Sequence, residues 1–277
     1  MKILVPTDFS ENAEHALKYA MNLASRINGQ IILYHFISIP VYSSDIPLAL
    51  PSEADLKKDA DQRLTEIKEQ YTRIFPGIPI SCETCVAINF PEDEIINEEI
   101  SAHADLVIMG TRGSGMRTIL GTNTAAVIEE SKIPVLAIPE GAEIKMPEKI
   151  AFAVNYSNDD LQNILSLIEL LKPLRASITI VHVSDHKENL SIADNELEIL
   201  LSRVRSESNY PFVHMNIITS DDTIESLNDW LSENKFNLLA VSMRKRSWAE
   251  KFFGRSMTIR MLYHTHVPLM AFHTTTE

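Results

Sequence analysis

The chain has 277 residues, of which 45% are hydrophobic and 23% charged, and its formal net charge is −13. This acidic balance disfavours nucleic acid and anionic membranes as partners, because neutralising phosphates needs clustered Lys and Arg. No apolar run approaches the roughly 18 residues of a membrane span, the N-terminus reaches Pro6 too soon for a secretory signal, and two cysteines offer no disulfide framework, so we expect a cytoplasmic protein.

Strand and helix alternate along the first half of the chain. The expected strands are the apolar runs 2–6, 30–36, 80–86, 106–109 and 135–138. The expected helices cover 11–28, about 52–74, about 91–102 and 122–131, with Ser10 as the N-cap of the first. Because the strands read as continuous apolar runs, the pattern predicts a mostly parallel sheet with helices on both faces.

The second half repeats this order. Residues 149–157 align with residues 2–10 at an offset of 147, and His182 aligns with His35 at the same offset. Residues 237–239 align with 105–107 at an offset of 132, and 267–269 with 133–135 at 134. We therefore predict two tandem domains, 1–145 and 146–277, each a five-stranded sheet.

A glycine-rich loop carries the strongest local signal for a ligand. Residues 109–115 read Met-Gly-Thr-Arg-Gly-Ser-Gly and leave an apolar strand, and residues 121–123, Gly-Thr-Asn, open a helix. Glycines let backbone N–H groups approach an anion, and a helix N-terminus adds donors and partial positive charge. A tight strand-to-helix turn without a ligand explains the same glycines, and the spacing matches neither the P-loop nor the dinucleotide fingerprint.

The chain resembles a tandem member of the universal stress protein (UspA-like) family. The segments that carry the resemblance are Ile3 to Ser10, Leu106 to Gly113 and Pro134 to Leu136. The resemblance implies a Rossmann-like fold of the adenine nucleotide alpha hydrolase type and pairing of the two domains through their last strands. It also implies a stress-response or regulatory role with ATP or another adenine nucleotide as ligand, and leaves Mg²⁺ and a further homodimer open.

The resemblance also assigns the binding residues, all in the N-terminal domain. The ATP-binding branch of the family is marked by Gly, two residues, Gly, nine residues, then Gly followed by Ser or Thr. Here only seven residues, 114–120, separate the second and third glycines, so the loop is two residues shorter. The implied set comprises Pro6, Thr7 and Asp8 near the adenosine, Phe36 and Met109 beside the base, and Gly110, Arg112, Gly113, Gly121, Thr122 and Asn123 at the phosphates.

Several of these residues also have simpler interpretations. Asp8 suits an Asx-type turn ahead of the first helix as well as a ligand contact. Arg112 suits a solvated loop. In the second domain Asn155 replaces Asp8 and Ser242 replaces Gly110, while a basic cluster replaces the glycines and suggests an anionic ligand, a partner or a solvated loop. That cluster consists of Arg244, Lys245, Arg246, Lys251, Arg255 and Arg260.

Other groups are weak candidates for chemistry. Cys82 and Cys85 lie three apart on a strand and point to opposite faces, which disfavours a metal or redox pair. His264 and His266 form a single pair ahead of Pro268, too few ligands for a metal site. The acids that follow Pro91 suit a helix N-terminus.

Three functions follow. The first is a non-enzymatic module that binds an adenine nucleotide in the N-terminal domain only. The second is an interaction scaffold of the same fold with an unidentified protein partner and no nucleotide. The third is a weak ATP hydrolase or self-phosphorylating protein, for which the sequence places no general base.

Overall fold

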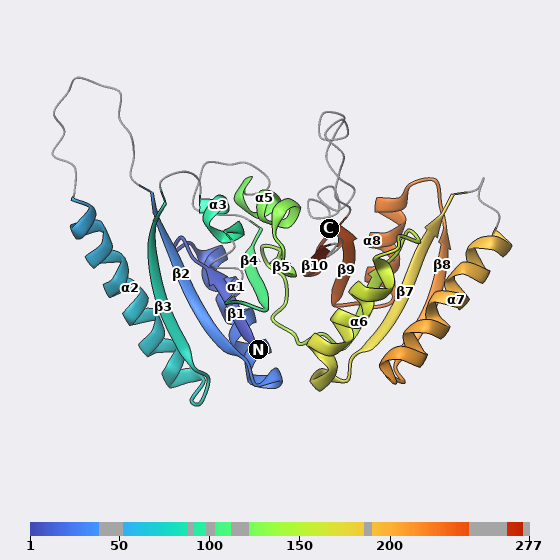
Figure 1. Cartoon of the computed structure of the whole chain (residues 1–277), viewed down its shortest axis with the longest axis horizontal. Helices are drawn as coiled ribbons and strands as arrows, with labels where there is room; N and C mark the ends of the chain where they lie inside the picture. Colours follow the sequence, from blue (N-terminus) through green and yellow to red (C-terminus); the bar gives the residue numbers. More distant parts are fainter. Residues whose placement is uncertain are drawn as a thin grey trace, which may run out of the picture. The chain divides into compact units, whose positions relative to one another are not determined.

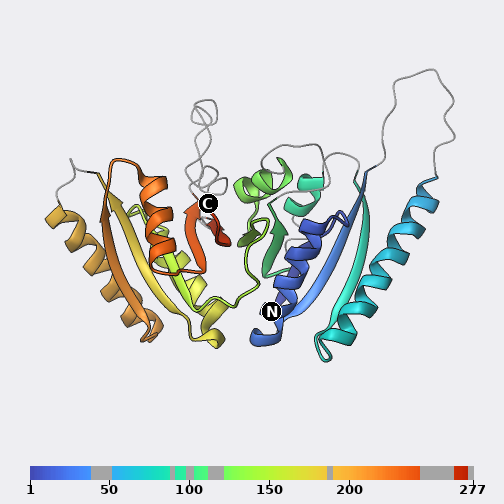
Figure 2. The ribbon, with the colours of Figure 1, turned by 180° about the vertical axis from the view of Figure 1, so that it is seen from behind.

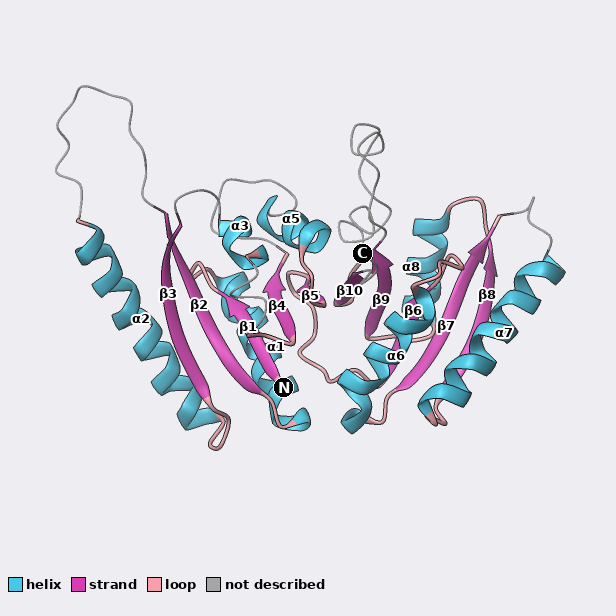
Figure 3. Cartoon of the chain, in the orientation of Figure 1, coloured by secondary structure: helices cyan, strands magenta, loops and turns pink. Residues whose placement is uncertain are grey.

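A computed structural model describes residues 1–38, 52–87, 91–97, 103–111, 122–185, 190–243 and 265–273. The chain forms two compact units, Met1–Ile133 and Pro134–Glu277. In each unit the strands form a sheet that helices flank (Figures 1 and 3). The expected division into domains 1–145 and 146–277 stays a prediction.

The first unit follows the expected alternation of strand and helix. Its elements are β1 (Lys2–Pro6), α1 (Glu11–Ile27), β2 (Gln30–Ser38), α2 (Glu53–Ile74), β3 (Ile80–Ala87), α3 (Pro91–Ile96), β4 (Leu106–Gly110) and α5 (Thr122–Glu130). The strands lie in the order β3-β2-β1-β4 and the pairs β1–β2, β1–β4 and β2–β3 are parallel. The chain thus moves outward from β1 to β3 and then returns to the other side of β1.

This reversal decides where the helices lie. Right-handed crossovers that step in the same direction leave their helices on the same face, so α1 and α2 cover one face. Helix α1 packs on β1, β2 and β4, and α2 packs on β2 and β3. Figure 2 shows α1 in front of the strands. Ile3, Leu4 and Val5 of β1 are fully buried, and since consecutive side chains of a strand point to opposite faces, both faces of β1 are covered.

Local chemistry sets the helix ends. The Ser10 hydroxyl accepts a hydrogen bond from the Ala13 N–H at 3.2 Å and so caps α1. The helix ends at Asn28, which is left-handed with φ 51° and donates to the Ala24 carbonyl. Ser52 and Asp55 form a capping box at the start of α2. The acids after Pro91 occupy the first turn of α3, as expected from the helix dipole.

The second unit repeats this arrangement. Its elements are β5 (Val135–Ile138), β6 (Lys149–Ala153), α6 (Asp160–Leu171), the 3₁₀ helix η1 (Lys172–Leu174), β7 (Ser177–Ser184), α7 (Leu190–Ser208), β8 (Val213–Thr219), α8 (Thr223–Glu233), β9 (Leu238–Met243) and β10 (Leu269–His273). The order is β5-β10-β9-β6-β7-β8. The two expected last strands, β5 and β10, pair antiparallel, with Met270 opposite Leu136.

Strand register supports the repeat at the level of single residues. Lys2 pairs with Gln30 in the first unit, and Lys149 pairs with Ser177 in the second, both 147 residues further on. Leu106 lies opposite Ile3, and Leu238, 132 residues beyond Leu106, lies opposite Ile150. The two offsets read from the sequence are therefore the offsets of the strand pairs.

Candidate functional site

The candidate site of the first unit lies where β1 and β4 end side by side. In the order β3-β2-β1-β4, the chain runs from β1 to β2 and β3 on one side and then returns to β4 on the other side of β1, so the carboxyl ends of β1 and β4 border the topological switch point. Ligands of open parallel sheets bind at such points. Pro6 ends β1 and Gly110 ends β4, so the switch point coincides with the segments that the sequence singled out.

The turn between β1 and α1 is held by its own polar groups. The Thr7 N–H donates to the Tyr34 carbonyl at 2.8 Å and extends the pairing with β2. The Thr7 hydroxyl accepts from the Phe9 N–H at 3.1 Å, and an Asp8 carboxylate oxygen accepts from the Ser10 N–H at 3.0 Å. The Asx-type turn predicted at Asp8 is thus present, and the Asp8 side chain remains exposed.

His35 of β2 holds this turn in place through its side chain. The His35 Nδ1 lies 2.8 Å from the Thr7 carbonyl oxygen, and since a carbonyl only accepts, Nδ1 carries the proton. The imidazole also stacks on Phe9 at 4.3 Å between ring centroids. Burial lowers the pKa of His35, the hydrogen bond to Thr7 opposes this, and the nearby Arg63 guanidinium lowers it further. The net effect lowers the pKa of His35 and so favours the neutral imidazole.

Arg63 of α2 completes the cluster. Its guanidinium carbon lies 4.1 Å from the centroid of the Phe9 ring, a cation–π distance. Phe9 itself has φ 62°, a left-handed conformation that is a genuine outlier for an aromatic residue. The Phe9 ring thus contacts both an imidazole and a guanidinium.

Gly110 is required by close packing. A Cβ on Gly110 would lie 2.9 Å from the Asn12 backbone oxygen, closer than Cβ atoms come to other atoms in proteins, and 3.1 Å from the Asn12 carbonyl carbon, which is also a tight contact. The Gly110 carbonyl in turn accepts a hydrogen bond from the Thr124 hydroxyl at 2.8 Å. The end of β4 therefore contacts the first turn of α1 and the first turn of α5.

The two residues expected beside the base, Phe36 and Met109, are largely buried. Phe36 is 9% exposed and Met109 7% exposed, so both present little surface. The Phe36 ring stacks on Tyr34 at 4.6 Å. Burial is the main cause of a raised Tyr34 pKa, and Cys85 adds to it.

The remaining predicted residues are only partly described. Arg112, Gly113 and Gly121 lie outside the described residues, as does the basic cluster from Arg244 to Arg260. Thr122 begins α5 and Asn123 is half-buried. The structure thus brings Pro6, Thr7, Asp8, Met109, Gly110 and the start of α5 to one end of the β1–β4 pair.

The sequence missed the His35, Phe9 and Arg63 cluster. One signal was available, because His35 and His182 align at the offset of 147. In the second unit His182 Nδ1 lies 3.1 Å from the Val154 carbonyl oxygen, and its ring lies 4.4 Å from that of Tyr156. A histidine that recurs beside the same turn in both copies indicates a shared structural role.

At the corresponding end of the second unit, several described polar groups bond to one another. Ser242, in place of Gly110, accepts a hydrogen bond from the Asn163 amide at 3.0 Å. Asp160 is 1% exposed, and its carboxylate accepts the Ser157 N–H at 2.9 Å, the Ser157 hydroxyl at 2.7 Å and the Asn155 N–H at 3.3 Å. These donors are therefore used internally.

The other chemical candidates gain no support. Cys82 and Cys85 are free thiols, and the Cys82 thiol donates to the Leu64 carbonyl at 3.5 Å. Among the described residues, no three His, Cys, Asp or Glu side chains are grouped as metal ligands would be. Within the same part of the chain, no helix combines the length and apolar character needed to cross a bilayer.

Comparisons with known proteins agree on one family. The sequence model of the Universal stress protein family matches residues 1–139. A universal stress protein of Methanocaldococcus jannaschii is 29% identical over 151 residues, which are 50% of this chain and 93% of that protein. A universal stress protein of Archaeoglobus fulgidus has a solved structure that is 20% identical with TM-score 0.73, covering 98% of this chain and 96% of its own.

The Archaeoglobus likeness shows that the fold is shared over nearly the whole length. A further universal stress protein was solved in complex with cAMP; it is 22% identical with TM-score 0.38, over 50% of this chain and 96% of its own.

Proposed function

We propose that this chain, which belongs to the universal stress protein family, binds an adenine nucleotide in its first unit and acts as a stress-response or regulatory protein. The observation that carries the proposal is the convergence at Gly110. This glycine lets the end of β4 approach Asn12 of α1, and its carbonyl accepts from Thr124 of α5. The start of α5 then offers backbone N–H donors beside a strand end, the arrangement that suits phosphate.

Each residue of the site takes a proposed role. The exposed Asp8 carboxylate lies at the end of β1, where it is suited to accept hydrogen bonds from ribose hydroxyls. Met109 and Phe36 border the adenine. Gly110, Gly113, Gly121, Thr122 and Asn123 face the phosphates, and Arg112 adds positive charge.

Binding is proposed for the first unit only, because the second unit satisfies its own donors. In the second unit the Asn163 amide donates to the Ser242 hydroxyl at the position that corresponds to Gly110. The buried Asp160 carboxylate accepts the N–H groups of the turn that follows β6. An anion placed there would meet a negative charge instead of free donors, which costs binding free energy.

Two measurements test nucleotide binding. The purified chain is denatured and the released small molecules are identified, and thermal unfolding is followed with ATP, ADP, AMP and cAMP, each with and without Mg²⁺. A ligand that binds only the folded state raises the unfolding midpoint by mass action. If no nucleotide is released and millimolar ATP leaves the midpoint unchanged, the chain is a scaffold without nucleotide. Product formation over time would instead reveal ATP hydrolysis.

A matched pair of variants locates the site. Asp8→Asn keeps an acceptor for the Ser10 N–H, removes the charge, and copies the residue of the second unit. We expect it to weaken nucleotide binding by about tenfold, which corresponds to roughly 1.4 kcal/mol. Asn155→Asp is the control in the second unit and should leave affinity unchanged. Binding that survives Gly113→Val would place the nucleotide away from the glycine loop.

A further inference from the structure

We propose that the outer face of α7 is a self-association surface, on which a second copy of this chain packs through the same helix in antiparallel orientation. This surface does not depend on nucleotide binding, because α7 lies in the second unit. It comprises Ile192, Glu196, Ile199 and Arg203 on the outer face, together with an adjoining groove.

The outer face of α7 carries apolar side chains that the fold leaves in solvent. Ile192 is 57% exposed and Ile199 54% exposed. Because residues seven apart lie on one stripe of a helix, about 10 Å apart along its axis, the two side chains form a single row. The buried row, Ala193, Leu197, Leu201 and Val204, lies on the opposite side and packs on the sheet.

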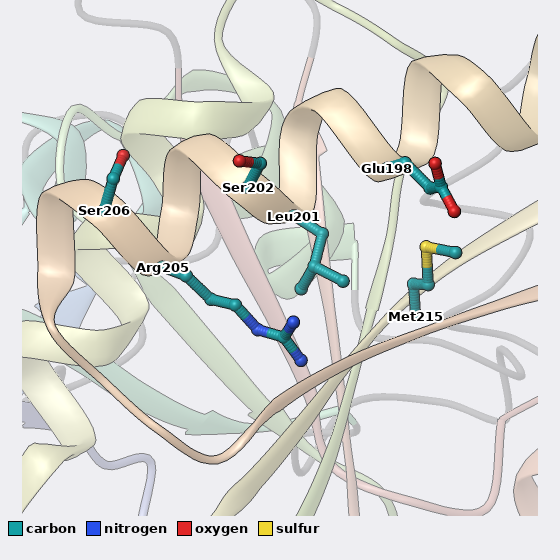
Figure 4. A pocket seen from close by; sticks show the side chains of 6 residues that line it. All are labelled: Glu198, Leu201, Ser202, Arg205, Ser206 and Met215. Atoms are coloured by element: carbon teal, nitrogen blue, oxygen red, sulfur yellow. The ribbon is translucent and has the colours of Figure 1, made fainter.

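The groove lies beside the C-terminal half of the same helix. It is lined by Glu198, Leu201, Ser202, Arg205, Ser206 and Met215 of β8, with a volume of about 540 Å³. Figure 4 shows Leu201 and Arg205 directed toward β8, with Ser202 and Ser206 on the outer side of the helix. The Arg205 guanidinium donates to the Val213 carbonyl at 2.6 Å, which holds the basic end of the groove in place.

Charge divides α7 into two halves. The N-terminal half carries Asp194, Glu196 and Glu198 and no cation, whereas the C-terminal half carries Arg203 and Arg205 against the single acid Glu207. Arg203 also pairs with Glu207 at 3.6 Å, but its side chain remains 60% exposed. Parallel packing of two such helices would bring like charges together, whereas antiparallel packing brings acidic and basic halves together.

In an antiparallel pair, each contact that is not on the two-fold axis occurs twice, once from each copy. With the two-fold axis near Ile199, this side chain meets Ile199 of the second copy, and Glu196 lies opposite Arg203 of the second copy. Ile192 then reaches the C-terminal half of the second helix, where the groove between Leu201 and Met215 receives it. Such reciprocity, in which residue i contacts j and j contacts i, is the property of a two-fold interface.

Light scattering and sedimentation equilibrium of the full chain test this surface. We expect the mass to rise from one chain to two with concentration. Ile192→Lys with Ile199→Lys should weaken dimerisation by about tenfold or more. Ile74→Lys is the matched control, since Ile74 is also 57% exposed but lies on α2. Urea midpoints equal to that of the unmodified chain establish that the variants remain folded.

A charge exchange identifies the second copy as the occupant. Glu196→Arg alone and Arg203→Glu alone should each weaken dimerisation, and the two changes in one chain should restore it, because each swapped charge then faces the other. The proposal is overturned by a chain that stays monomeric at every concentration. A dimer that the isoleucine variants leave intact, or charge changes that add without rescue, would equally overturn it.

Discussion

His35 Nδ1 lies 2.8 Å from the Thr7 carbonyl oxygen, and His182 repeats the contact with Val154 in the second unit at 3.1 Å. Both histidines stack on an aromatic residue with positive φ, Phe9 at 62° and Tyr156 at 58°. The two units therefore share one way of fixing the turn that leaves their first strand. The two units differ in the polar and charged side chains around that turn.

His35 makes the stability of the first unit depend on pH. Burial lowers its pKa below the usual 6.5, so as the pH falls the unfolded chain takes up a proton before the folded chain does. Stability is therefore complete above about pH 6.5 and is lost as the pH falls through the lowered pKa of the folded state. We expect the urea midpoint to fall between about pH 7.5 and pH 5.5.

The variant His35→Gln should reduce this fall, because the side chain no longer titrates. His214→Gln removes an exposed imidazole and controls for the loss of a histidine elsewhere. A pH profile that is identical in the unmodified chain and in His35→Gln would rule out His35 as the source.

Gly110→Ala should destabilise the first unit by about 1–3 kcal/mol, the usual cost of overpacking. The new Cβ would meet main-chain atoms of Asn12, the nearest at 2.9 Å. Since those atoms remain whatever side chain stands at Asn12, adding Asn12→Ala should not rescue the variant. Urea unfolding of both single variants and the double variant measures this, and a double variant as stable as Asn12→Ala alone would refute the main-chain clash.

Most of the fold could be predicted from the sequence because strands buried on both faces appear as continuous apolar runs. Residues 106–109 are apolar throughout, and all four are buried in β4. The repeat offsets recur in the strand pairs because two copies of one fold place equivalent residues opposite each other. The glycine loop could be located, since Gly110 is placed by sequence at the end of a strand.

The contacts around the turn could not be read from the sequence. Nothing in the residue Phe9 signals a left-handed backbone, because most aromatic residues avoid it. Arg63 lies 54 positions from Phe9 in the chain, and only the packing of α2 brings its guanidinium to the ring. Similarly, the sequence shows only that Ser242 replaces a glycine, and the hydrogen bond that Ser242 accepts from Asn163 depends on the packing of α6.

Asp160→Ala should destabilise the second unit by about 2–4 kcal/mol, because it leaves the part-buried donors of Asn155 and Ser157 without their charged acceptor. The carboxylate accepts from the backbone of Asn155 and from both the backbone and hydroxyl of Ser157. Asp222→Ala is the comparison, since Asp222 also accepts two backbone N–H groups, of Ile224 and Glu225, but is exposed.

Loss of the exposed cap should cost only about 1 kcal/mol. Chemical unfolding of the two variants under identical conditions compares them. Equal losses would mean that burial adds nothing to the role of Asp160.

Arg63→Gln should change both the stability of the first unit and the pKa of His35. Removing the guanidinium 4.1 Å from the ring centroid should cost about 0.5–1 kcal/mol, as for an exposed cation–π contact. It should also raise the pKa of His35, because Arg63 is one of the groups that lower it. A proton NMR titration of His35 measures the shift, and urea unfolding measures the stability.

Arg63→Lys retains the charge and should preserve most of the pKa effect, while Lys57→Gln removes an exposed cation from the same helix and should change neither quantity. A His35 pKa that stays the same in Arg63→Gln would show that the guanidinium holds only the ring and has no influence on the imidazole.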